Sequence, residues 1–224
     1  MTNFILVPGM WLGAWAWDAV AEPLRAAGHD VTAVTLGGLA ERAGEPATLD
    51  SHIDDIVAAA GDRGAVTLVG HSYGGLPVRG AVERLGDRVT RVAYVDSGPV
   101  PDGTAQADFS GLAEVDVPPP SFDPADDPQQ FAGLEGRSAE LRARSTPHPK
   151  ESVNGRLRLL KAEQPPTELV VSTFAKADAE QMIAAGHPFF AGLDRRDYRV
   201  HALPTGHWPM FSRPADLASL LAAL

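Results

Sequence analysis

Short apolar runs alternate along the chain with segments whose apolar residues recur at helical spacing. The runs rich in Val, Ile and Leu are predicted strands, near 3–8, 30–35, 65–70, 89–95, 167–173 and 197–203. Helices are predicted between and after them, at 15–27, 49–61, 73–85, 178–185 and 214–223. This alternation is typical of a mostly parallel six-stranded sheet with helices on both faces, so the predicted fold class is α/β.

The stretch from about 103 to 166 breaks this alternation. Three prolines begin at Pro118, further Asp and Pro residues follow through Pro128, and helix-like patterns cover 133–144 and roughly 151–163. A segment of this length is seldom structureless in a compact domain, and lids are its commonest function. We therefore expect one domain over 1–224 with a small helical cap inserted at about 103–166. A disordered surface insertion is the alternative, because 116–130 has few apolar residues.

The amino-acid composition indicates which classes of partner and chemistry to exclude. The 224 residues carry a formal net charge of −10, and no Lys/Arg-rich run is present, so we expect neither a nucleic-acid nor an anionic-membrane partner. With no cysteine, disulfides, thiolate catalysis and Cys-ligated metals are excluded. The share of hydrophobic residues, 44%, is ordinary for a globular protein.

The apolar start of the chain superficially resembles a signal peptide. No basic residue precedes it, Pro8-Gly9 interrupts it, and the same residues are needed for the first core strand. No other run approaches the roughly 20 apolar residues of a membrane-spanning helix. We therefore expect a cytoplasmic protein.

The most informative motif is GHSYG at residues 70–74, directly behind an apolar run. It fits the G-x-S-x-G pattern of a nucleophile elbow, in which a strand turns sharply into a helix and exposes the serine, here Ser72. The bare pattern is common by chance, so its context has to support it. A strand-like run with a Pro-Gly turn precedes it, and His207 follows on a turn between the last strand and the last helix. That chain order is the order of α/β-hydrolases.

A serine hydroxyl needs an imidazole to take its proton, and the imidazole needs a carboxylate to orient it. Ser72 and His207 are the first two candidates. Asp96, at the carboxyl end of the strand near 89–95, is favoured as the acid, because a carboxylate at a buried strand end is costly unless paired. Asp178 is the alternative acid, although its Asp-x-x-Gln pattern also has an ordinary explanation as a helix cap.

Backbone N–H groups can stabilise the oxyanion of an acyl-transfer reaction. We expect one from Tyr73, directly after the serine, and one from Met10 in the turn after the first strand, with Trp11 as the neighbouring candidate. The histidines outside the motifs have no metal-ligand spacing, and the glycine pairs lack a phosphate-binding pattern. No metal and no organic cofactor are expected.

Four segments resemble the small α/β-hydrolases related to plant methylesterases and hydroxynitrile lyases, which have many bacterial relatives. They are VPGMWLGAWAWDAV (7–20), GHSYGG (70–75), YVDSGPVPDG (94–103) and LPTGHWPMFSRPADLA (203–218). The resemblance implies a Ser-His-Asp hydrolase with an oxyanion hole from Met10 and Tyr73, a helical cap over an apolar pocket and, in many members, a homodimer.

Two departures from the family pattern refine this expectation. Relatives commonly carry the acid in the loop after the strand ending at Thr173, which here reads Phe-Ala-Lys-Ala, so Asp96 or a displaced Asp178 is favoured. Lyase members have a lysine beside the histidine, where this chain has Trp208.

The resulting hypothesis is a serine hydrolase of the carboxylesterase type. It would cleave small, largely apolar esters through an acyl-enzyme, in a pocket predicted to be lined by Trp11, Trp208, Phe211, Phe122 and Phe131. A lyase-type enzyme on the same scaffold is one alternative. A non-catalytic ligand-binding homologue is another.

Overall fold

The computed structural model describes residues 1–160, 164–194 and 197–224. Its centre is a six-stranded, all-parallel sheet in the order β2-β1-β3-β4-β5-β6. The strands are β1 (Asn3–Val7), β2 (Asp30–Ala33), β3 (Val66–His71), β4 (Val89–Val95), β5 (Thr167–Val171) and β6 (Tyr198–Ala202). Each lies within a predicted run or one residue beyond it, so the predicted α/β fold is confirmed.

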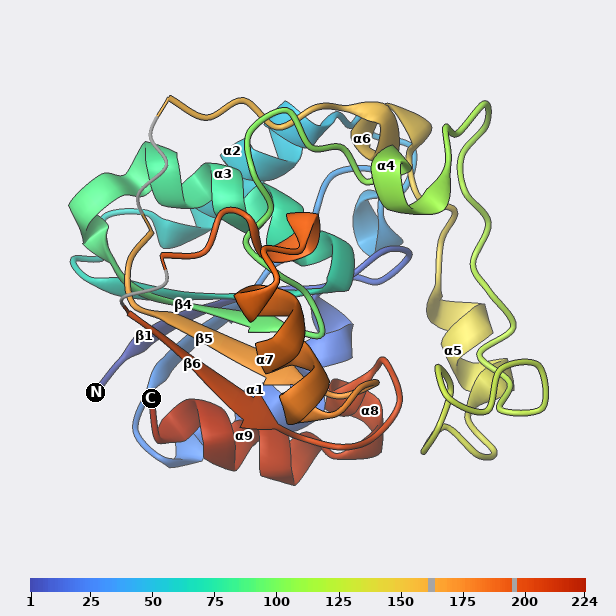
Figure 1. Ribbon diagram of the computed structural model, residues 1–224. Helices are drawn as coiled ribbons and strands as arrows, with labels where there is room; N and C mark the ends of the chain where they lie inside the picture. Colours follow the sequence, from blue (N-terminus) through green and yellow to red (C-terminus); the bar gives the residue numbers. More distant parts are fainter. Residues whose placement is uncertain (161–163, 195–196) are drawn as a thin grey trace.

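Helices cover both faces of the sheet (Figure 1). On one face α1 (Asp18–Ala26) packs against α9 (Pro214–Ala222), and on the other α2 (Leu49–Ala60) packs against α3 (Gly75–Leu85). Near β6 lie α7 (Lys176–Ala184) and the single turn α8 (Pro209–Ser212). The start of α2 shows why the helix begins there: Thr48 and Ser51 form a reciprocal capping box.

Side chains of one strand enter two separate hydrophobic clusters. In β1, Ile5 and Val7 join the cluster that includes α2 and α3, whereas Phe4 and Leu6 join the cluster with α1 and α9. Successive strand residues point to opposite faces, so a strand buried on both faces must be apolar throughout. This explains why the predicted strands are continuous apolar runs rather than alternating ones.

The inserted segment leaves the domain after β4 and returns before β5 (Figure 1). It contains α4 (Ala107–Ser110), α5 (Ser138–Arg144) and α6 (Lys150–Asn154). Its two ends pair through an antiparallel bridge between Ala105 and Arg156, and a second bridge joins Val117 to His148. The segment also buries apolar residues such as Leu134 and Leu141 in the core cluster.

The two predicted helices of this segment are shorter than expected. Before α5, Gly133 and Gly136 take positive φ angles of 81° and 76°, which keeps that stretch from being helical. After α6, Gly155 is extended and Arg156 pairs with Ala105, so the predicted helix near 151–163 ends at Asn154. Residues 161–163 of that prediction lie outside the described residues.

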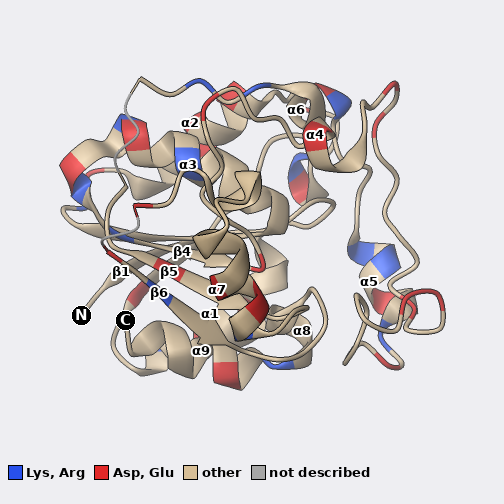
Figure 2. Cartoon of the chain, viewed as in Figure 1, with Lys and Arg blue, Asp and Glu red and all other residues tan. Residues whose placement is uncertain are grey.

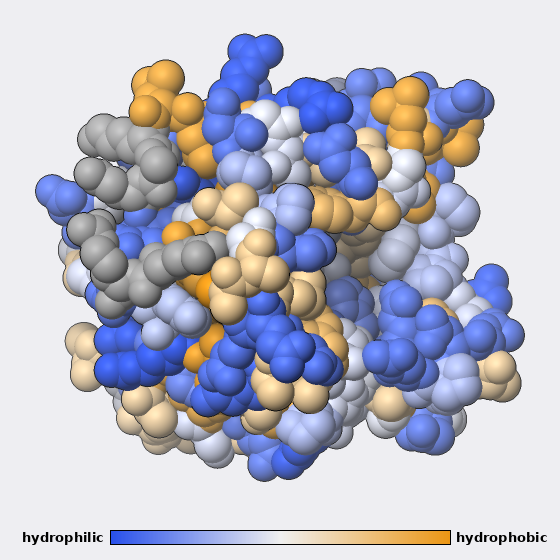
Figure 3. All heavy atoms as spheres, in the orientation of Figure 1, coloured by the Kyte–Doolittle hydropathy of each residue, from blue (hydrophilic) through white to orange (hydrophobic). Residues whose placement is uncertain are grey.

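Charged residues are distributed over the outer helices and the loops (Figure 2). In the same view hydrophilic atoms predominate, with hydrophobic atoms in separate patches (Figure 3). Within the described ranges, no helix has the length and apolar character needed to cross a membrane. Over the same ranges, no group of three or more His, Asp or Glu side chains is placed to hold a metal ion.

Candidate active site

Ser72 stands where β3 turns into α3, with a positive φ of 51°. The turn is tight because its glycines lie against other backbone. A Cβ on Gly70 would approach the carbonyl oxygen of Gly74 to 2.8 Å, and a Cβ on Gly74 would approach that of Pro8 to 2.5 Å. The GHSYG pattern therefore forms a nucleophile-elbow geometry, and side chains at both glycine positions are sterically excluded.

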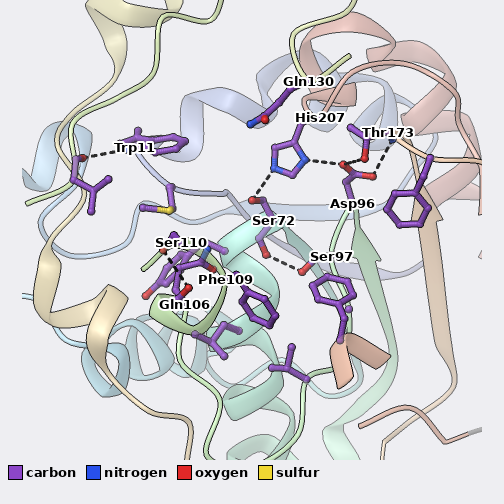
Figure 4. A pocket seen from close by; sticks show the side chains of 18 residues that line it. Trp11, Ser72, Asp96, Ser97, Gln106, Phe109, Ser110, Gln130, Thr173 and His207 are labelled. Atoms are coloured by element: carbon purple, nitrogen blue, oxygen red, sulfur yellow. Dashed lines mark hydrogen bonds and ion pairs between the residues drawn. The ribbon is translucent and has the colours of Figure 1, made fainter. Parts of the chain in front are cut away.

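His207 follows β6 and reaches Ser72 across the carboxyl edge of the sheet (Figure 4). Its Nε2 lies 2.8 Å from the Ser72 hydroxyl. The backbone of His207 is held from two sides: its N–H donates to the carbonyl of Gln130 (2.7 Å), and its carbonyl accepts from Nε2 of His71 (2.6 Å).

Asp96 completes a hydrogen-bonded chain of three side chains. It follows β4 with a φ of 45°, its side chain is 3% exposed, and its Oδ2 lies 2.6 Å from Nδ1 of His207. Its Oδ1 accepts from the backbone N–H groups of Ser172 (2.9 Å) and Thr173 (3.2 Å). Burial by itself would raise the pKa of Asp96, but the hydrogen bonds from His207, Ser172 and Thr173 outweigh it and lower the pKa. The carboxyl group is therefore ionised at neutral pH.

Asp178 is placed differently. It is exposed in the first turn of α7, and the hydrogen bond at Nδ1 of His207 goes to Asp96 instead. The helix starts earlier than predicted, at Lys176 with Ala175 as its N-cap, so Asp178 does not cap it. Its carboxylate still lies at the positive end of the helix dipole, which is favourable.

A cavity of about 420 Å³ opens beside the Ser72 hydroxyl. Apart from Asp96 and His207, its lining carries no charged side chain, and most of its surface is apolar. Figure 4 shows the side chains, which come from the sheet edge, from the inserted segment and from the loops before and after α7. The lining residues are Met10, Trp11, Ser72, Tyr73, Leu76, Asp96, Ser97, Gly98, Val100, Gln106, Phe109, Ser110, Val117, Gln130, Thr173, Phe174, Phe189 and His207.

Of the five predicted lining aromatics, only Trp11 borders this cavity. Trp208, 1% exposed, stacks on Phe131 (5.3 Å between ring centroids) and packs edge-on against Phe122 (5.1 Å). Phe211 stacks on Trp15 instead. The prediction was wrong for these four residues because helical caps and cores are both rich in aromatics. The ring of Trp208 packs edge-on against that of His207, with centroids 4.9 Å apart, so the cluster contacts the imidazole.

The phenylalanines that line the cavity are Phe109, Phe174 and Phe189. Phe109 lies on α4 and meets Phe189 edge-on, with ring centroids 5.6 Å apart. Sequence reasoning missed all three, because α4 and the turn at 188–190 carry no strong helical pattern. Of the three, only Phe174 could have been recognised from the sequence as a lining residue, because it occupies the loop after β5 at the carboxyl edge of the sheet.

Met10 and Tyr73 both border the cavity beside Ser72. The N–H of Trp11, the other candidate donor, is directed to Nδ1 of the fully buried His148 (3.3 Å). His71, under the elbow, is also fully buried, and burial together with the neighbouring His207 lowers its pKa to about 3. His71 is therefore neutral, and its role is to bond the His207 carbonyl.

A parallel sheet covered on both faces, with a serine elbow, a histidine after the last strand and an aspartate at one carboxyl edge, defines an α/β-hydrolase fold. The chain belongs to the alpha/beta hydrolase family, whose model matches residues 4–220. The predicted family membership is thereby confirmed.

Individual relatives are similar over part of their length. The carbendazim hydrolyzing esterase of Nocardioides sp. (strain SG-4G) is 40% identical over 102 residues, 43% of this chain and 42% of that protein. Esterase PIR7B of Oryza sativa subsp. japonica is 41% identical over 100 residues, 42% of this chain and 37% of that protein. Each match therefore spans less than half of the relative. An extracellular α/β-hydrolase from a Paenibacillus species has the same fold throughout, with a TM-score of 0.82, 20% identity and coverage of 100% of this chain and 98% of that one.

Proposed function

We propose that this protein is a serine hydrolase that cleaves small, largely apolar carboxylic esters through an acyl-enzyme. The observation that carries the proposal is the hydrogen-bonded chain from Ser72 through His207 to Asp96 at the edge of a largely apolar cavity. The family to which the chain belongs and the names of its esterase relatives support the same reaction type.

In the proposed reaction, Ser72 Oγ attacks the ester carbonyl while Nε2 of His207 takes the hydroxyl proton. Asp96 stabilises the resulting imidazolium, and the N–H groups of Met10 and Tyr73 stabilise the oxyanion. His207 then gives its proton to the departing alcohol, which leaves an acyl group on Ser72. A water molecule, deprotonated by His207, releases the acid and restores the hydroxyl.

The lining and the volume of the cavity indicate the substrate class. Leu76, Val100 and Val117 contribute aliphatic surface and three phenylalanines contribute aromatic surface. A free carboxylate would find no Lys or Arg side chain there, and the one carboxylate in the lining, Asp96, is already paired with His207. A volume of about 420 Å³ suits a small ester. An uncharged, largely apolar ester is therefore the expected substrate.

We also propose that the inserted segment over 103–166 acts as the cap of this site. Phe109 and Gln130, both in that segment, line the cavity. A cytoplasmic location remains our proposal. We also propose that the protein has no nucleic-acid or membrane partner, which the net charge of −10 supports. Homodimer formation is a separate proposal that light scattering on the purified protein would test.

The first experiment measures hydrolysis of a chain-length series of p-nitrophenyl esters by wild type, Ser72→Ala, Asp96→Asn and Asp178→Asn. We expect Ser72→Ala and Asp96→Asn to lose roughly 10⁴-fold in kcat, because the nucleophile or the orienting carboxylate is gone. Asp178→Asn is the matched control, and its kcat should stay within about twofold because the residue is solvated and outside the hydrogen-bonded chain.

Two outcomes would contradict the proposal. Turnover by a wild type whose Ser72 is not labelled by a fluorophosphonate would favour the lyase-type alternative. A folded wild type that binds esters but hydrolyses none would favour the ligand-binding alternative.

A further inference from the structure

The turn after β1 is held by the inserted segment through the polar groups of one residue, Trp11. Its carbonyl accepts from the N–H of Thr146 (3.0 Å), its N–H donates to Nδ1 of His148 (3.3 Å), and its indole N–H donates to the carbonyl of Val117 (2.9 Å). Trp11 has a φ of 68°, a conformation that L residues rarely adopt. Such a backbone persists only where its surroundings hold it in place.

The three partners of Trp11 form one unit. Val117 and His148 exchange backbone hydrogen bonds of 2.8 Å in both directions, which makes a short antiparallel bridge. Thr146 lies two residues before His148 in the same stretch. The three hydrogen bonds of Trp11 therefore all come from the inserted segment.

His148 also contacts the second turn of the site. Its ring packs edge-on against the ring of Tyr73, with centroids 4.4 Å apart. The Tyr73 hydroxyl is in turn bonded to Nδ1 of His52 (2.7 Å), whose Nε2 bonds the carbonyl of Gly37 (2.9 Å). Since a carbonyl only accepts, Nε2 of His52 carries the proton and the tyrosine hydroxyl donates to Nδ1. The side chain of Tyr73 is thus fixed between two buried imidazoles.

The position of the proton on the His148 ring follows from its hydrogen bonds in the same way. Its Nδ1 accepts from an N–H, so the ring is neutral and its proton lies on Nε2, a buried atom without a partner among the described residues. Leaving a buried N–H unpaired costs free energy. The ring nevertheless occupies the position where it reaches both Trp11 and Tyr73.

We propose that His148 is a positioning residue for the oxyanion hole: its neutral imidazole holds the Met10–Trp11 turn and the Tyr73 ring so that the two backbone N–H groups converge beside Ser72. This inference rests on the proposed ester hydrolysis. Its physical basis is that oxyanion donors contribute through preorganisation, and one such donor is worth about 10²–10³ in kcat. The inserted segment would then build part of the catalytic site as well as covering it.

The test compares three substitutions at this position on p-nitrophenyl butyrate. In His148→Asn the side-chain oxygen can replace Nδ1 as the acceptor for Trp11, whereas His148→Gln places its oxygen near the former Nε2, and His148→Ala has no acceptor. We expect kcat within about threefold of wild type for Asn and a loss of about 10- to 100-fold for Gln and Ala, with KM within about threefold throughout. If Ala does not fold, the Asn and Gln pair still decides the question.

A second readout addresses the oxyanion directly. A phenethyl trifluoromethyl ketone is attacked by Ser72 to give a hemiketal oxyanion, so its inhibition constant should rise in parallel with the loss of kcat across the series. His29→Ala is the control, because His29 also has an unpartnered buried ring nitrogen but precedes β2 at the opposite edge of the sheet. It should change the urea midpoint without changing inhibitor affinity.

If kcat and inhibitor affinity stayed at their wild-type values in all three variants, the proposal would be overturned. Equal losses in His148→Asn and His148→Gln would overturn it as well. Failure of the proposed function looks different, because wild type itself would then neither hydrolyse the ester nor bind the ketone.

Discussion

Three residues with side chains adopt positive φ angles at the candidate site: Trp11, Ser72 and Asp96, at 68°, 51° and 45°. Each costs of order 1–3 kcal/mol and persists only because the surrounding structure holds it. Each follows a parallel strand, at the edge where the site lies. The hydroxyl of Ser97, directly after Asp96, donates to the carbonyl of Ser72 (2.7 Å) and so links two of these strained turns.

At the residue scale, we predict that Gly74→Ala destabilises the protein by about 2 kcal/mol or more. Its Cβ would lie 2.5 Å from the carbonyl oxygen of Pro8 and 2.8 Å from that of Val7, and backbone cannot move aside as a flexible side chain can. Urea unfolding measures the change. Gly64→Ala is the matched control, since nothing lies within 4 Å of its added Cβ, and it should change stability by less than about 1 kcal/mol. Equal effects of the two substitutions would contradict the steric argument.

At the element scale, two groups of aromatic residues have different roles. One is on the short helix α4, and the other is the cluster of Phe122, Phe131 and Trp208. Phe109 on α4 is 52% exposed and lines the cavity. Phe131 is buried in the aromatic cluster, where it stacks on Trp208, which in turn contacts His207 edge-on. The first residue contacts the space for substrate, and the second contributes to the core.

We therefore predict opposite effects of truncating these two phenylalanines. Phe109→Ala should raise KM for aromatic esters by about 3- to 10-fold and leave the urea midpoint nearly unchanged, because little buried surface is lost. Phe131→Ala should cost about 3–5 kcal/mol of stability and leave KM close to wild type, provided the assay temperature keeps the variant folded. Steady-state kinetics and urea unfolding on both variants separate the effects, and a KM change confined to Phe131→Ala would reverse the assignment.

At the scale of the whole molecule, three fully buried histidines couple folding to pH: His52, His71 and His148. Burial lowers the pKa of each below 6.5, and for His71 to about 3. In the unfolded chain these rings take up protons as the pH falls below about 6.5, while in the folded protein they take up protons only at lower pH. The unfolded state therefore binds more protons, and acid favours unfolding.

We predict that the free energy of unfolding falls by about 3 kcal/mol or more between pH 6.5 and 5, since each such histidine contributes up to about 1.4 kcal/mol per pH unit. The lowered pKa of Asp96 affects stability only at lower pH. The stabilisation that the ionised Asp96 contributes is lost as the pH falls through the folded-state pKa of this group. Urea unfolding across this range gives the slope. In His148→Asn one of the three groups is gone, so the slope should decrease by about one proton, and an unchanged slope would contradict the assignment.

The sequence alone determined the strands, the parallel sheet that they form and the class of chemistry. Buried parallel strands must be apolar on both faces, and the elbow requires glycines beside its serine, so both leave local patterns that can be read directly. Ser72 and His207 were predicted from such patterns, and the structure brings their side chains together. Asp96 and Asp178 remained as alternatives, because both follow strands and sequence spacing does not measure distance.

Only the tertiary structure decided which side chains meet. Asp96 lies 2.6 Å from the histidine because β4 is next to β3 in the sheet and Asp96 accepts hydrogen bonds from the residues after β5. Asp178 is instead exposed to solvent in the first turn of α7. The lining of the cavity and the contacts of Trp11 with His148 depend on an inserted segment with long irregular stretches. Such stretches carry no hydrophobic period, so their packing follows from long-range contacts that no local pattern encodes.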